Sequence, residues 1–215
     1  MNVLDKIERK TRWLAIPNLM FLLSGMMLAT YLLQFALPEE NIYSYLYLNW
    51  DLIRAGEVWR VLSFLILPPM SSPIFILFSL YFYCLIGNGL ERQWGTSRLT
   101  LFYLTGVVFA IIGSLFTGYA TNEYLNLSLF FAFAALFPKF EILVFFVLPI
   151  EVRFLALLDA VYFVYALIVS PWPERIAILL SVFNILIFFW NDIYRTIKLR
   201  SSTWKTRRNF KKNMR

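Results

Sequence analysis

Residues 99–119, LTLFYLTGVVFAIIGSLFTGY, form an apolar run that contains no charged side chain. A helix that crosses the hydrocarbon core of a bilayer needs about 20 mostly apolar residues, so this run predicts a membrane span. The whole chain has the same character, because 60% of its 215 residues are hydrophobic and only 15% are charged. A soluble domain has about 25% charged residues. We therefore expect an integral membrane protein.

Five other apolar runs are suited to helices in the membrane, so the sequence predicts an all-α polytopic membrane protein with six spans. These cover 17–37, 73–90, 99–119, 124–137, 154–169 and 175–190. The fourth is short, since its helix would rise only about 20 Å, and we expect it at the centre of the bundle. The expected organisation is a cytoplasmic segment 1–16, a membrane domain 17–193 and a basic tail 194–215.

The segments between the expected spans differ in composition. Residues 39–59 are rich in Tyr and Trp, which favour the headgroup region, so we expect an interfacial first loop. Residues 140–149 are expected to be either interfacial or re-entrant, followed by a polar break at 151–153. The proline-rich stretch 170–174 predicts a turn before the last span.

Basic residues are unevenly distributed along this chain of net charge +7. With both termini cytoplasmic, 17 of the 20 Lys and Arg residues lie on the cytoplasmic side, as the positive-inside rule requires. Nine of them lie in 195–215, and we expect this tail to bind anionic lipid headgroups, not nucleic acid. The polar start and the long first apolar run predict no cleavable signal peptide. We expect a protein of the bacterial cytoplasmic membrane.

The chain contains no histidine and a single cysteine, Cys84. One cysteine cannot form an intrachain disulfide, and zinc sites are built mainly from cysteine and histidine. The acidic residues are scattered along the sequence. We therefore expect no metal site and no cofactor.

Three short motifs accompany these spans. GEVWRVLSF at 56–64 precedes the second span, GNGLERQWG at 87–95 ends it, and LFP at 136–138 with LPI at 148–150 joins the fourth to the fifth. In this order, over about 17–190, they resemble the rhomboid superfamily. The resemblance implies a six-helix rhomboid-like bundle with an interfacial first loop and a short central fourth helix.

The resemblance also implies roles for single residues. Trp59 and Arg60 would belong to a first loop that dips into the outer leaflet and shapes substrate access. A plain interfacial anchor is the alternative, with the guanidinium on a phosphate or a loop carbonyl. Gly87, Glu91 and Gly95 would form a structural turn in which Glu91 accepts hydrogen bonds from backbone amides. Without that role, Glu91 would lie at a helix end facing water.

The catalytic residues of rhomboid proteases are missing. Those enzymes use a Gly-x-Ser-Gly serine near the start of the fourth helix and a histidine on the sixth. The serine's counterpart falls near Glu123, and the sixth span reads LSVFN at 180–184. A serine needs an adjacent base to act as a nucleophile, and Ser128 has none. The chain thus resembles a rhomboid pseudoprotease, closer to the Derlins than to cleaving rhomboids, and we expect no catalytic residue.

Three polar residues lie inside the expected spans. An ionisable side chain such as Asp159 costs about 3 kcal/mol in the membrane and usually faces a cavity or the bundle interior. Asp159 is expected either to contact a proton or substrate, or to pair with Asn184, Ser181 or a tyrosine hydroxyl. Ser181 and Asn184 are one helical turn apart, where they form an interhelical hydrogen bond or a ligand site.

Three functions remain open from the sequence. The favoured hypothesis is a non-catalytic protein that binds the transmembrane segments of client proteins and locally perturbs the bilayer, assisting membrane protein quality control, folding or trafficking. The second is a transporter of ions or small molecules that uses Asp159. The third is a membrane scaffold that recruits partners through its basic tail, 194–215.

Overall fold

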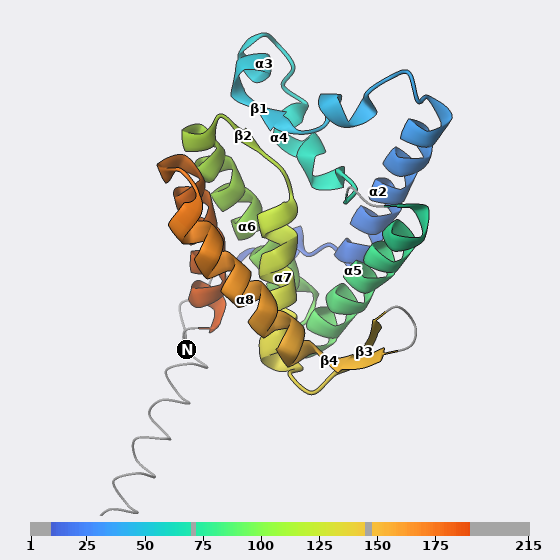
Figure 1. The fold of residues 1–215 in the computed structure, drawn as a ribbon, viewed down its shortest axis with the longest axis vertical. Coiled ribbons are helices and arrows are strands. Elements are labelled where there is room, and N and C mark those ends of the chain that lie inside the picture. Colours follow the sequence, from blue (N-terminus) through green and yellow to red (C-terminus); the bar gives the residue numbers. More distant parts are fainter. Residues whose placement is uncertain (1–9, 70–71, 145–147, 190–215) are drawn as a thin grey trace, which may run out of the picture.

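The computed structural model describes residues 10–69, 72–144 and 148–189, most of which are helical (Figure 1). Within this part of the chain, five helices are long and apolar enough to cross a membrane. They cover Arg12–Ala36, Pro73–Trp94, Thr96–Thr117, Val152–Val169 and Trp172–Phe189. The protein is therefore a polytopic integral membrane protein. The basic tail 194–215 lies outside the described residues.

A short helix, α7 (Glu123–Leu136), occupies the centre of the bundle (Figure 1). It packs against three longer helices, which are α5 (Pro73–Trp94), α6 (Thr96–Thr117) and α8 (Val152–Val169). Most of its residues are buried. Other helices therefore surround the stretch that the sequence predicts as a short helix over 124–137. On the far side of α5, α2 (Leu19–Ala36) completes this half of the bundle.

The first loop folds into short elements over one end of the bundle. These are η2 (Ile42–Tyr45), β1 (Leu48–Asn49), α3 (Trp50–Arg54), α4 (Arg60–Ser63) and η3 (Phe64–Ile66). Strand β1 pairs antiparallel with β2 (Tyr119–Ala120), so Leu48 lies opposite Ala120. The indole Nε1 of Trp50 also donates to Ser114 Oγ at 2.8 Å. These contacts fasten the first loop to the α6–α7 connection.

The connection between α7 and α8 is a β-hairpin, a form of structure that the sequence prediction for 140–149 did not include. Strand β3 (Glu141–Val144) pairs antiparallel with β4 (Leu148–Glu151). The physical reason is composition, since β-branched and aromatic residues favour strands and the segment is too short for a span. The expected polar break at 151–153 is shorter in the structure, because β4 ends at Glu151 and α8 begins at Val152.

Two other boundaries differ from the sequence prediction. Helix α5 continues to Trp94, so Gly87 and Glu91 are helical and only Gly95, with φ of 84°, turns the chain. Glycine inside a helix is tolerated here because Gly87 packs directly against Met20 of α2. The last helix begins at Trp172, within the expected turn 170–174. Proline in the first turn of a helix loses no backbone hydrogen bond, which explains how 173 can be helical.

Candidate functional site

A groove of about 680 Å³ runs between α5 and α8, with α7 as its floor. Each wall contributes one helical face. The α5 face presents Phe78, Ser79, Phe82, Tyr83 and Ile86, and the α8 face presents Leu155, Leu158, Asp159 and Tyr162. The groove is thus mostly apolar, with polar groups along its length.

The groove is open on the side of the bundle. Leu158 lines it and is still 67% exposed. Its neighbour Leu157 is 63% exposed but is not among the residues that line the groove. Because α8 is long and apolar enough to cross a membrane, we expect this exposed side to face lipid. A hydrophobic segment in the bilayer can therefore reach the groove without passing through water.

Two polar side chains in the groove have acceptor atoms without a hydrogen-bond partner among the described residues. Asn126, on α7, has a buried Oδ1 atom that accepts no hydrogen bond. Asp159, near the middle of α8, is half-buried, and no hydrogen bond or ion pair involves its carboxylate within the described part of the chain. Polar groups in an apolar medium are stabilised when they form a hydrogen bond with a partner. The groove therefore favours an occupant that carries hydrogen-bond donors.

The expected pairing of Asp159 with Asn184 or Ser181 is wrong. Asp159 lines the groove, whereas the other two residues line a second cavity of about 200 Å³ between α6, α7 and the last helix. Asn184 is fully buried, accepts a hydrogen bond from Thr105 Oγ1 at 2.8 Å and donates to the Phe102 carbonyl at 3.3 Å. It therefore joins the last helix to α6.

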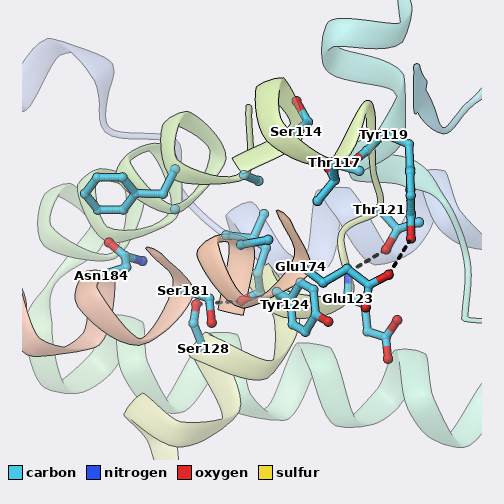
Figure 2. Close-up of a pocket in the computed structure, with 16 residues that line it drawn as sticks. Ser114, Thr117, Tyr119, Thr121, Glu123, Tyr124, Ser128, Glu174, Ser181 and Asn184 are labelled. Carbon is cyan, nitrogen blue, oxygen red and sulfur yellow. Dashed lines mark hydrogen bonds between the residues drawn. The ribbon is translucent and has the colours of Figure 1, made fainter. Parts of the chain in front are cut away.

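Figure 2 shows the second cavity, with Ser128 and Ser181 among its lining residues. The hydroxyl of Ser128 donates to the Leu125 carbonyl at 2.7 Å, one turn back in its own helix. The only ionisable side chains in the lining belong to Glu123, Glu174 and two tyrosines. The chain has no histidine. Among the residues that the structure describes, no imidazole or ammonium group lies beside either serine in this cavity.

The first-loop motif separates into one buried and one exposed residue. The guanidinium of Arg60, 2% exposed, donates to the carbonyls of Ser44 and Tyr47 at 2.7 and 3.0 Å and pairs with Glu57 at 2.6 Å. Trp59 is 52% exposed and donates only to the Tyr45 carbonyl, at 3.3 Å. Arg60 therefore holds the loop together, and Trp59 presents its ring to the surroundings.

Glu91 connects three helix ends. Its carboxylate accepts the backbone N–H of Asn18, at the start of α2, and the hydroxyl of Thr96, at the start of α6, at 2.7 Å. The backbone amide that it binds thus belongs to Asn18, just before α2, and not to the turn after α5, where the resemblance had suggested it. Gly95 occupies that turn.

Sequence reasoning missed Asn126 and Glu174 as site residues. Asn126 is a single amide in the apolar run of α7, which is a signal that the sequence does contain. Glu174 could not be singled out, because only folding brings it to Tyr119, whose hydroxyl donates to its carboxylate at 3.5 Å.

Comparisons with known proteins do not assign this site, since neither the family models nor the curated proteins searched match the chain.

Proposed function

We propose that this chain is a non-catalytic, rhomboid-like membrane protein that binds a transmembrane segment of a client protein in the α5–α8 groove. The observation that carries the proposal is the groove's side opening, with Leu158 exposed at its rim. Moving an apolar helix from lipid into this groove costs little free energy, because both surroundings are apolar. Binding then assists the quality control, folding or trafficking of the client.

The polar groups of the groove give the proposal its selectivity. Asp159 and the Oδ1 atom of Asn126 both accept hydrogen bonds, and neither has a partner among the described residues. A client helix that carries a hydroxyl, amide or basic side chain would satisfy them, and hydrogen bonds between membrane helices contribute about 0.6–2 kcal/mol each. A stable apolar helix offers no such gain. The groove thus selects transmembrane segments that carry polar side chains, which are unfavourable in lipid alone.

The absence of catalysis rests on the chain's composition and on the second cavity. Without histidine, a serine nucleophile would need another base, and no lysine lines this cavity. The hydroxyl of Ser128 donates its proton in a hydrogen bond to a carbonyl of its own helix. The proposal therefore gives both serines no part in bond cleavage.

The proposal further counts α7 as a sixth span and assigns both termini to the bacterial cytoplasm. Basic residues support this orientation: the end of the bundle where α5 meets α6 carries Arg92 and Arg98, and the β3–β4 hairpin is flanked by Lys139 and Arg153. Arg98 Nη2 donates to the Phe188 carbonyl at 3.3 Å, so the last helix finishes at that end as well. Such residues concentrate on the cytoplasmic side of membrane proteins.

Photo-cross-linking in cells tests the proposal. A benzophenone amino acid replaces Leu158 in the groove or, as the matched control, its equally exposed neighbour Leu157 outside it. Recovery of single-span or tail-anchored membrane proteins from 158 but not from 157 would support client binding. Equal recovery from both positions, or lipid adducts alone from 158, would overturn it.

A steric variant gives a second test. Ser79→Trp fills the groove from α5, whereas Leu77→Trp adds the same ring to an exposed position of the same helix that does not line it. Loss of the cross-linked clients in the first variant alone would support the groove as their site. Unchanged recovery would show that clients bind elsewhere.

A further inference from the structure

We propose that the second cavity, between α6, α7 and the last helix, binds a small organic ammonium ion. The cavity measures about 200 Å³, well above the roughly 10–15 Å³ of such volume that one water molecule needs. A compact amine with a short polar chain has this size. The cavity and the α5–α8 groove have only Thr121 and Glu123 in common, so the inference is independent of client binding.

Two carboxylates mark one end of the cavity. Glu123 is the first residue of α7, and Glu174 lies in the first turn of the last helix. Within the described residues neither forms an ion pair, because the adjacent Arg175 turns away and donates to the carbonyls of Ser170 and Ile168. An ammonium group has three donors and no acceptor, which suits two carboxylates without ion-pair partners, of which Glu174 also accepts the Tyr119 hydroxyl at 3.5 Å.

Aromatic rings adjoin these carboxylates. Figure 2 shows Tyr119 and Tyr124 beside Glu123 and Glu174, and both rings line the cavity. Burial, followed by the negative charge of Glu174, raises the pKa of the Tyr119 hydroxyl. The Tyr119 phenol therefore stays neutral at physiological pH, and ring faces attract a cation. Carboxylates together with aromatic rings favour an organic cation over an anion.

The other end of the cavity carries an unused hydroxyl. Ser181 is only 9% exposed, lines the cavity, and its Oγ has no hydrogen-bond partner among the described residues. It follows Glu174 by seven residues, a rise of about 10 Å along the helix. A buried hydroxyl without a partner is unfavourable, and a ligand with a polar end would satisfy it. This observation distinguishes the cavity from a simple pair of surface carboxylates.

A metal ion fits these residues less well. Within the described ranges, histidine, cysteine and acidic residues form no group of three or more that could hold one. Calcium takes six to eight oxygen ligands, and magnesium demands a near-ideal octahedral arrangement of oxygens. The cavity instead combines two carboxylates with rings and a distant hydroxyl. The same ammonium chemistry can come from a soluble amine or from the headgroup of phosphatidylethanolamine.

Calorimetric titration of the purified full-length chain with ethanolamine tests the inference. We expect saturable binding in detergent, at least tenfold weaker in Glu174→Gln and about threefold weaker in Ser181→Ala, but unchanged in Asp51→Asn. Asp51 is an exposed carboxylate of the first loop. Ethylene glycol, which lacks the charge, should not bind. Circular dichroism checks folding, and Ser181→Ala serves as the test if Glu174→Gln fails to fold.

Two results would overturn the inference: no saturable binding of ethanolamine, or displacement of bound ethanolamine by an equal concentration of Ca²⁺. Repeating the titration in nanodiscs identifies the source of the ammonium group. If phosphatidylethanolamine discs suppress ethanolamine binding relative to phosphatidylglycerol discs, the headgroup occupies the cavity. If both discs allow equal binding, the ligand is a soluble amine.

Discussion

The carboxylate of Glu91, near the end of α5, accepts the backbone N–H of Asn18, 73 residues earlier, at 3.2 and 3.3 Å. Asn18 precedes α2 and has a left-handed backbone, with φ of 53°. The first N–H groups of a helix have no partner within the helix, so a carboxylate there both fills a hydrogen bond and opposes the helix dipole. Glu91 thereby sets where α2 begins relative to α5.

We expect Glu91→Ala to lower the free energy of unfolding by about 1–3 kcal/mol, because a hydrogen bond to a charged acceptor is lost. Glu91→Gln should cost less, since its amide oxygen still accepts one bond. Denaturant titration in detergent micelles measures both. The control is Gln93→Ala, at an exposed position two residues away. An equal effect of Glu91→Ala and the control would show that the contact with Asn18 contributes nothing.

A methyl group at Gly87 should separate α2 from α5. A Cβ atom built there would overlap the Cβ and Cγ atoms of Met20, so overpacking by Gly87→Ala should cost about 1–3 kcal/mol. Gly25→Ala is the matched control, since a Cβ there meets nothing within 4 Å. Alanine is a better helix former, so that variant should gain up to about 1 kcal/mol. The opposite order of stabilities in the same titration would contradict the close packing of α2 on α5.

Arg60 and Trp59, though adjacent, should respond differently to mutation. Removing the buried guanidinium leaves Glu57 and two loop carbonyls without their donors, so Arg60→Ala should cost about 3–5 kcal/mol. Arg60→Lys should recover little of this loss, because an ammonium cannot reproduce the forked geometry. Trp59→Phe should change stability by less than about 1 kcal/mol.

Brominated lipids, which quench tryptophan fluorescence on contact, complete the comparison of these two residues. Quenching should fall in Trp59→Phe, because Trp59 is exposed and we expect its indole to contact the bilayer interface. An unchanged quenching signal together with a large loss of stability in Trp59→Phe would assign Trp59 the structural role that we give to Arg60.

Much of the architecture follows from the sequence because hydrophobic length is a local property. The uncharged run over 99–119 and the proline-terminated run before Pro38 both predict helices that the structure contains, within a few residues at each end. The hairpin at 141–151 could not be predicted in this way, since a short apolar segment has no periodicity that separates a strand from a membrane-dipping loop.

The site could be predicted only in part, because it depends on which helices become neighbours. Asp159 stands out in the sequence as a charge in an apolar run, yet its expected partner was wrong. Asn184, which was one of the partners expected for Asp159, lies in the other cavity and accepts a hydrogen bond from Thr105. Spacing identifies the face of one helix, but it does not identify the helix that packs against that face.

We expect Asp159 to lower the free energy of unfolding of the protein and to contribute to client binding. Its carboxylate has no partner among the described residues, so Asp159→Leu should raise the free energy of unfolding by about 2–3 kcal/mol, the cost of an acidic residue at this depth. The same variant should reduce clients cross-linked from position 158, most strongly those with a polar residue in their span. Leu157→Ala, outside the groove, should leave recovery unchanged.

The same variant separates the two alternatives for Asp159. A fall in stability would mean that the carboxylate has a structural partner, and normal client recovery would remove it from the binding site. Ion or solute flux through reconstituted vesicles that is abolished by Asp159→Asn would instead support a transporter, because a midplane carboxylate is then needed for passage and not for holding a helix. We expect the wild type to show no flux and Asp159→Leu to lose cross-linked clients. The reason is that Asp159 lies in a groove that opens on the side of the bundle.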